Sequence, residues 1–288
     1  MASTSSPPLS SDPSSSPQNS NEIDDSNNID GTCASPLLFG NENTAKIAIV
    51  ASKKTEIDSD LWGKPFAVIV PDTVTSVEPS AFLECRGLTL INFPPTLTSI
   101  GSFAFYDCTA LSEVVIPPTI GAIGRSVFYN CLSLETIAIP NSITEIGNSL
   151  FLRCSGLTSV TIPDSVTVIG RWGFGFCSAL TAIEIPSSVT SIENCAFSGC
   201  TGLTSITIPQ SVTKLGVEAF ANCVGLTCMT IPNSVTIIAT SLFSGCTALT
   251  SVDIPNSVAS IQSHAFRWCT ALSSIRLPTS LTMIGWYA

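Results

Sequence analysis

LTSITIPQSVTKLGVEAFANCVG, residues 203–225, is one unit of a repeat and holds every element of the fold that we predict. Leu203, Ile206 and Ile208 place apolar side chains at i, i+3 and i+5. The alternation of apolar and polar residues from Ile206 to Ile208 is typical of a short strand in which the intervening Thr207 points outward. The unit therefore begins with a strand that has one buried face and one exposed face.

The rest of the unit turns the chain back toward the next strand. Pro209 ends the strand, because proline has no N–H to donate to a sheet. We expect the hydroxyl of Ser211 to bond local backbone and to stack as a ladder under the next coil. Gly216 follows an inward-facing leucine where a sharp bend would require positive φ. Phe220 and Cys223 lie three residues apart, which predicts that they share one face of a short helical or 3₁₀ turn.

The unit recurs with a constant spacing of 23 residues and without insertion or deletion. The strand-ending prolines are Pro71, Pro94, Pro117, Pro140, Pro163, Pro186, Pro209, Pro232, Pro255 and Pro278. The phenylalanines of the turn are Phe82, Phe105, Phe128, Phe151, Phe174, Phe197, Phe220, Phe243 and Phe266. The cysteines that follow them are Cys85, Cys108, Cys131, Cys154, Cys177, Cys200, Cys223, Cys246 and Cys269. A fixed period of this length predicts stacked units, each of which contacts only its neighbours.

The repeat pattern L-x-x-I-x-I-P-x-S-V-x-x-I-x-x-x-A-F-x-x-C resembles the BspA-like leucine-rich repeats over about residues 65–288. We predict an α/β repeat solenoid, a right-handed leucine-rich-repeat coil stack. A parallel β-sheet lies on one of its faces and short helical or 3₁₀ turns lie on the other. The resemblance implies an interaction or adhesion scaffold at the cell surface that has no catalytic activity of its own.

Three segments are predicted along the chain. Residues 1–44, rich in Ser, Pro and Asn, form a disordered tail because they have few apolar residues with which to offset the entropy of ordering. Residues 45–70 form a degenerate N-terminal cap that has Trp62 where a cysteine would fall. Residues 71–288 form the solenoid, whose last coil is incomplete, which indicates a truncated chain. The chain as written shows no signal peptide and so predicts a cytoplasmic location, whereas the family resemblance implies the cell surface.

Composition argues against several classes of function. The formal net charge of −10 opposes binding to nucleic acid, and no apolar stretch is long enough for membrane insertion. His264 is the single histidine of the chain, so a histidine-based catalytic or metal site is disfavoured. It lies at a position that varies from coil to coil, which indicates the surface. We predict no enzyme activity, no cofactor and no metal.

The nine repeated cysteines are interpreted as small residues of the core, because free cysteine is among the most buried residue types. Disulfides between neighbouring coils and a zinc ladder are the alternatives. Both are disfavoured, because parallel side chains in a column do not give disulfide geometry and the array has no C-x-x-C pair.

The outward strand position is the candidate binding site, because its side chain varies while the repeat stays constant. We predict that a protein or a cell-surface ligand binds there. The residues we assign to the site are Thr161, Glu184, Thr207, Thr230, Asp253 and Arg276. A generic solvated face and an ice- or glycan-binding surface are alternatives for these positions. A structural spacer, or the substrate-recognition part of a larger protein whose catalytic domain is missing, are alternative functions.

Overall fold

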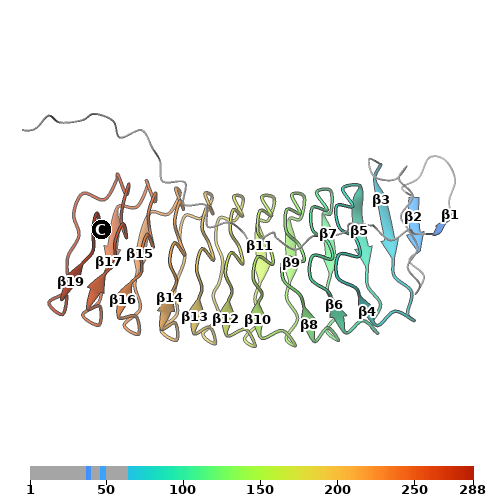
Figure 1. Ribbon diagram of the computed structural model, residues 1–288, viewed down its shortest axis with the longest axis horizontal. Coiled ribbons are helices and arrows are strands. Elements are labelled where there is room, and N and C mark those ends of the chain that lie inside the picture. Colours follow the sequence, from blue (N-terminus) through green and yellow to red (C-terminus); the bar gives the residue numbers. More distant parts are fainter. Residues whose placement is uncertain (1–36, 40–45, 50–63) are drawn as a thin grey trace, which may run out of the picture. The chain divides into compact units, whose positions relative to one another are not determined.

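The computed structural model describes residues 37–39, 46–49 and 64–288, in which the coils stack side by side from β3 to β19 (Figure 1). Most coils carry two short strands that belong to two series. The first series lies in the alternating run of each repeat unit and consists of β3 (Phe66–Ile69), β5 (Leu88–Asn92), β7 (Glu113–Val115), β9 (Thr136–Ala138), β11 (Ser159–Thr161), β15 (Cys228–Thr230) and β17 (Ser251–Asp253). The second series consists of β4 (Ser76–Val77), β6 (Ser99–Ile100), β8 (Ala122–Ile123), β10 (Glu145–Ile146), β12 (Val168–Ile169), β13 (Ser191–Ile192), β14 (Lys214–Leu215), β16 (Ile237–Ile238), β18 (Ser260–Ile261) and β19 (Met283–Ile284).

The first series gives the parallel strands that the alternating residues predict, divided among three sheets that contain β3-β5-β7, β9-β11 and β15-β17. Its strands pair in parallel and in register, for example Thr230 with Asp253 and Thr161 with Ala138. The central residue of each three-residue strand is buried and its two neighbours are exposed. Where no strand is assigned, Glu184 still bridges to Thr207 in the parallel sense. The prediction of a parallel sheet on one face is therefore confirmed.

The second series of strands was not predicted. Val212 and Leu215 are buried, as their apolar character indicated, but Leu215 also belongs to a two-residue strand that pairs with its neighbour in the preceding coil. A strand of two residues contains only one inward and one outward side chain. It is therefore too short to produce a period-two pattern in the sequence.

The prediction of short helical or 3₁₀ turns is wrong, because the described residues contain no helix. In the segment that contains Phe220, the N–H groups of Ala221 and Cys223 donate to carbonyls three residues back, as in a 3₁₀ turn. The N–H groups of Phe220 and Asn222, which alternate with them, donate instead to carbonyls of the following coil. Every second donor is thus used between coils, which prevents a continuous helix. For the same reason the described ranges hold no helix long and apolar enough to cross a membrane.

Positive φ recurs at two positions of this turn segment, for example 58° at Glu218 and 58° at Asn222. His264, with φ of 61°, occupies the first of them. Variation among coils at this first position indicated a surface location, but Ser126 and Cys195 are buried there. Residues at this position of different coils therefore have the same backbone conformation but differ in solvent exposure.

The repeated glycines do not have the predicted positive φ. Among the described residues, positive-φ glycines occur at Gly199 and Gly245, which belong to a different position of the coil. At Gly216 a Cβ atom would lie 2.4 Å from the backbone nitrogen of Asn194 in the preceding coil. A side chain at Gly216 would therefore require a local shift of the backbone, because the two coils approach closely there.

Columns of identical side chains fill the core. The phenylalanine rings from Phe82 to Phe266 form one continuous stack, with centroid separations of 5.1–5.8 Å between successive rings. The hydroxyl ladder is confirmed, but its bonds are not local. Ser211 Oγ donates to the carbonyl oxygen of Val189 in the preceding coil at 2.7 Å, and Ser165 and Ser257 make the equivalent bonds. Each coil is thereby bonded to the one before it through side chains as well as through backbone.

The N-terminal part of the chain is described only in segments. β1 (Leu37–Phe39) pairs antiparallel with β2 (Lys46–Ile49), and β2 pairs in parallel with β3. In the expected cap, Val68 and Val70 are buried. Trp62 and the predicted tail, apart from residues 37–39, lie outside the described residues.

Candidate functional site

One residue per coil forms the candidate site, which we call the strand strip: Thr161, Glu184, Thr207, Thr230, Asp253 and Arg276. All six residues are exposed. Thr161 ends β11, Thr230 ends β15 and Asp253 ends β17. Parallel pairing places Glu184 beside Thr207 and Thr230 beside Asp253, each pair at equivalent positions of neighbouring coils. The structure therefore brings these four predicted site residues together in pairs.

A second exposed row lies two residues before the strand strip on the same face of the sheet. It contains Ser159, Ala182, Ser205, Cys228 and Ser251. Small hydroxyl side chains are frequent in both rows, so the surface has many hydrogen-bonding groups.

An open hollow of about 850 Å³ lies over part of this face. Thr161, Glu184 and Thr207 of the strand strip line it, together with residues of the second row. Its floor includes Val160 and Ile206, each of which is 8% exposed. The hollow is open to solvent, so it suits a chain segment or a protein surface better than a fully enclosed small molecule.

The charges of the strand strip are isolated. Glu184, Asp253 and Arg276 form no ion pair with any residue that the structure describes. Such exposed charges are well screened in physiological salt. Shape and hydrogen bonding, more than charge, therefore characterise this face.

The cysteine column is part of the core. From Cys131 to Cys269, each cysteine of the column is free and buried, which contradicts disulfides between neighbouring coils there. The Cys223 thiol donates to the carbonyl oxygen of Phe197 at 3.1 Å, and the same oxygen accepts the backbone N–H of Cys200 at 3.2 Å. Burial raises the pKa of Cys154 and of Cys200 to about 12. These thiols are therefore protonated donors of the scaffold, unsuited to act as nucleophiles or as metal ligands.

The remaining groups with potential chemistry are dispersed. His264 is half-buried, and its ring lies 5.5 Å from that of Tyr287. Within the described ranges no serine hydroxyl bonds to its imidazole, and no group of three or more His, Cys, Asp or Glu residues could hold a metal ion. The arrangement assembles neither a catalytic dyad nor a metal centre there.

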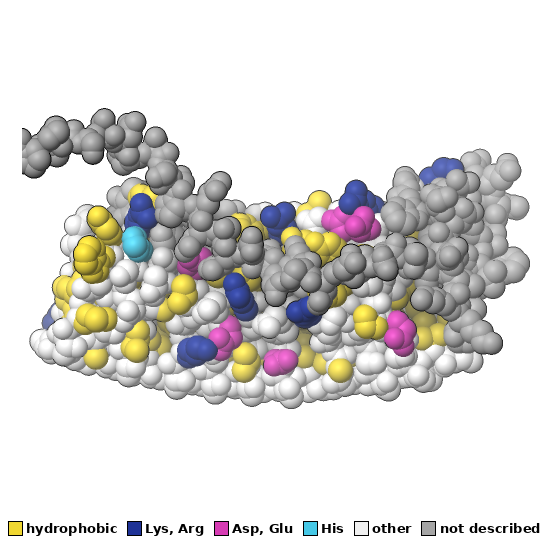
Figure 2. Space-filling view, in the orientation of Figure 1, with side chains coloured by type: hydrophobic (Ala, Val, Ile, Leu, Met, Phe, Trp, Pro, Cys, Tyr) yellow, Lys and Arg dark blue, Asp and Glu magenta, His cyan; other side chains and the backbone are white. Residues whose placement is uncertain are grey.

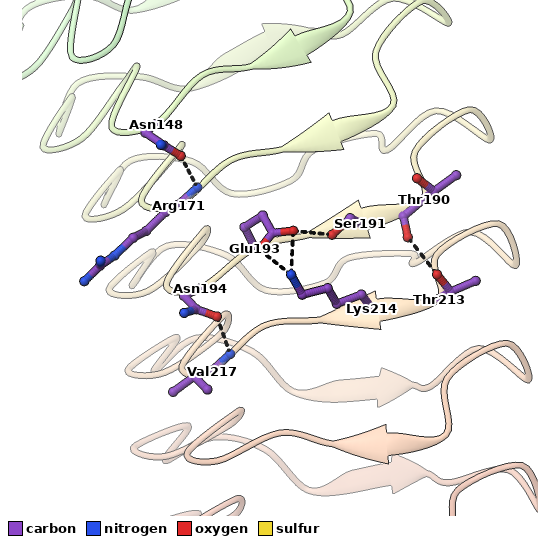
Figure 3. Close-up of polar contacts among 9 residues, drawn as sticks. All are labelled: Asn148, Arg171, Thr190, Ser191, Glu193, Asn194, Thr213, Lys214 and Val217. Atoms are coloured by element: carbon purple, nitrogen blue, oxygen red, sulfur yellow. Dashed lines mark hydrogen bonds and ion pairs between the residues drawn. The ribbon is translucent and has the colours of Figure 1, made fainter.

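One ion pair joins two coils on the side of the second strand series (Figure 3). Lys214 Nζ lies 2.9 and 2.7 Å from the two carboxylate oxygens of Glu193, and Ser191 Oγ donates to Glu193 at 2.6 Å. Partial burial alone would raise the pKa of Glu193, but the bonds from Lys214 and Ser191 outweigh it and lower that pKa. Because Lys214 is well exposed, the pair adds little to stability.

Sequence reasoning missed the thiol-to-carbonyl bonds, because their two partners lie 26 residues apart. It also missed the arginine and aromatic residues of the turn segments. The signal that could have revealed them is the complete absence of acidic residues from three consecutive turns, 124–132, 147–155 and 170–178, each of which carries an arginine.

Comparisons with known proteins agree with this architecture. A family model described as "BspA type Leucine rich repeat region (6 copies)" matches residues 66–181 and 173–288. The crystal structure of a leucine-rich repeat protein from Bacteroides ovatus ATCC 8483 is similar, with a TM-score of 0.57 and 22% identity over 87% of this chain and 89% of that one. The T. pallidum leucine-rich repeat protein gives a TM-score of 0.55 and 28% identity over 66% of this chain and 87% of that one.

A leucine-rich cell surface protein from Faecalibacterium prausnitzii A2-165 also matches, with a TM-score of 0.44 and 24% identity over 90% of this chain and 94% of that one. A search of curated protein sequences found no match.

Proposed function

Because the chain belongs to the BspA-type leucine-rich repeat family, we propose that it is a non-enzymatic protein-interaction or adhesion scaffold that binds a protein or cell-surface ligand through the strand strip. The observation that carries this proposal is the contrast between the two sides of each strand. Inward side chains repeat almost unchanged, whereas Thr161, Glu184, Asp253 and Arg276 differ in charge and size at equivalent positions. Variation on a constant backbone is how repeat proteins form specific binding surfaces.

The strand strip can vary because the fold does not use its side chains. Thr207 and Thr230 are exposed, and their hydroxyls form no hydrogen bond with any described residue. The threonines that do stabilise the stack lie elsewhere, such as Thr213, whose Oγ1 donates to the carbonyl oxygen of Thr190 at 3.3 Å (Figure 3). A substitution in the strip should therefore change binding and leave stability nearly unchanged.

The hollow supports a partner that lies across the coils. It spans three neighbouring coils, and Ser159 and Ser205 contribute hydroxyl groups to its edges. A partner segment lying across the coils would contact both exposed rows at once. The contact should be driven by shape and hydrogen bonds, with modest dependence on salt.

The test is a selection of binding peptides from a displayed random library against the whole chain. Thr207→Arg combined with Thr230→Arg should abolish binding of the selected peptides and change the melting temperature by no more than a few degrees. The matched control is Thr201→Arg combined with Thr247→Arg, which places the same charges at exposed positions of the turn side. Peptides that bind the strip variant normally and lose binding to the control variant would show that the wrong face has been chosen.

A further inference from the structure

The turn side of three consecutive coils carries an uncompensated positive charge, although the net charge of the chain is −10. Segments 124–132, 147–155 and 170–178 contain three arginines and no acidic residue. These arginines are exposed, and none of them forms an ion pair with a described residue. The arginines are Arg125, Arg153 and Arg171. Their guanidinium groups are therefore available to an external partner.

Aromatic rings lie beside these arginines. The rings of Trp172 and Phe176 stack with a centroid separation of 5.6 Å and an interplanar angle of 12°. The Arg153 guanidinium lies 6.0 Å from the centroid of the Phe176 ring, and Phe176 is 42% exposed. We call Arg125, Arg153, Arg171, Trp172 and Phe176 the arginine–aromatic patch. Figure 2 shows one face of the molecule, over which Lys and Arg, Asp and Glu, and hydrophobic side chains are distributed.

Two glycines make room for the two rings. A Cβ atom at Gly175 would lie 2.6 Å from Cε3 of Trp172, and one at Gly199 would lie 2.4 Å from Cδ1 of Phe176. Both distances are shorter than real contacts, so a side chain at either glycine would displace the ring. The local sequence thus holds both rings against the backbone of the turn.

The backbones that carry the arginines are fixed from both sides. The backbone N–H of Arg171 donates to Asn148 Oδ1 at 3.0 Å, and its carbonyl accepts the N–H of Ser149 at 2.8 Å (Figure 3). The N–H of Arg125 donates to Ser102 Oγ at 3.3 Å in the same way. Arg125 and Arg171 occupy equivalent positions two coils apart, so their backbones lie roughly 10 Å from one another.

From this arrangement we infer that the arginine–aromatic patch binds an acidic peptide segment of a partner protein, independently of the strand strip. Guanidinium groups bind carboxylates through paired hydrogen bonds, and arginine clusters recognise acidic motifs. A peptide in the polyproline II conformation rises about 3.1 Å per residue and has three residues per turn. Acidic residues at i and i+3 then lie on one face about 9 Å apart, which matches the spacing between Arg125 and Arg171. An apolar residue between them would contact Trp172 and Phe176, and such aromatic and arginine residues dominate the energetics of protein interfaces.

A short acidic peptide fits better than a long polyanion. The negative charge of the chain as a whole repels a polyanion along its length, whereas a peptide with two carboxylates contacts only the patch. Binding should weaken as salt is raised, because the arginines are exposed and their attraction is screened.

The experiment measures fluorescence anisotropy of a labelled peptide that has glutamates at i and i+3 and a leucine between them, added to the whole chain. A matched peptide with glutamine in place of both glutamates should bind at least tenfold more weakly. Arg125→Gln combined with Arg171→Gln should weaken binding of the acidic peptide at least tenfold, and Phe176→Ala should also weaken it. Arg276→Gln, which removes an exposed arginine of the strand strip, should have no effect.

Several results would overturn the inference. One is equal binding of the two peptides, and another is an unchanged affinity in the double arginine variant. A third is binding of an acidic oligosaccharide or of anionic lipid vesicles when the peptide does not bind. The strand-strip variant, Thr207→Arg with Thr230→Arg, should bind the acidic peptide as the unmodified chain does. Failure at one surface can therefore be distinguished from failure at the other.

Discussion

Phe174→Ala tests whether the phenylalanine stack stabilises the solenoid through contacts on both sides of each ring. Phe174 is fully buried and lies between Phe151, at 5.5 Å, and Phe197, at 5.4 Å. Phe266 occupies the equivalent position near the end of the array, is only partly buried and stacks on one ring, that of Phe243, at 5.6 Å. The two residues occupy the same position of the repeat but differ in the number of phenylalanine rings that stack on them.

The expected losses in the free energy of unfolding follow from the burial of each ring and from the number of rings it stacks on. Truncation of a buried phenylalanine costs about 3–5 kcal/mol, and an aromatic pair contributes about 0.5–1.5 kcal/mol beyond the area it buries. Since Phe174→Ala breaks two pairs and leaves a cavity enclosed on both sides, we expect a loss of about 5 kcal/mol. Phe266→Ala breaks one pair at a half-open site, so we expect about 2 kcal/mol.

Equilibrium unfolding in guanidinium chloride, followed by far-ultraviolet circular dichroism, measures both losses. The slope with denaturant must be compared among variants, because the central substitution can uncouple the two halves of a repeat array. Equal losses of unfolding free energy at the two positions would refute the idea that contacts on both sides of each ring stabilise the solenoid. A loss below about 2 kcal/mol for Phe174→Ala would also refute it.

Two further predictions concern the contacts between coils. Burial raises the pKa of Cys154 and Cys200 from 9.0 to about 12, so the unfolded chain releases thiol protons that the folded chain retains. The free energy of unfolding should therefore be largest below about pH 8.5 and should fall as the pH rises from 9 toward 12. The fall should be smaller in the variant that combines Cys154→Ala with Cys200→Ala. An equal decrease of the unfolding free energy with pH in the two proteins would contradict this. Ser188→Ala should cost about 1 kcal/mol in chemical denaturation, because Ser188 Oγ donates to the carbonyl oxygen of Val166 at 2.6 Å. The exposed Ser187→Ala, whose hydroxyl has no described partner, should cost nearly nothing, and a similar cost for both would count against the ladder.

The sequence alone determined the repeat, the first strand series and the residues that face inward. The constant spacing of Pro209 and its equivalents shows one coil per unit, and the alternation around Thr207 shows which side chains point outward. These features are local, because a short alternating run and a proline specify a strand and its end irrespective of the neighbouring coil. The exposed row of the candidate site follows from the same alternation, although its function stays a prediction.

Only the tertiary structure decided how the coils are bonded to one another. Phe220 and Cys223 have the spacing of a helical turn, but the intervening N–H of Asn222 donates to Ser244 of the next coil, so no helix forms. In the same way, the thiol of Cys223 bonds to Phe197 and a Cβ at Gly216 would meet the backbone of Asn194. The partners in these contacts lie 22 or 26 residues apart, and a residue spacing of three is compatible with both a helix and a chain of turns. The choice between them depends on which donors the adjacent coil accepts, and that is known only once the coils are stacked.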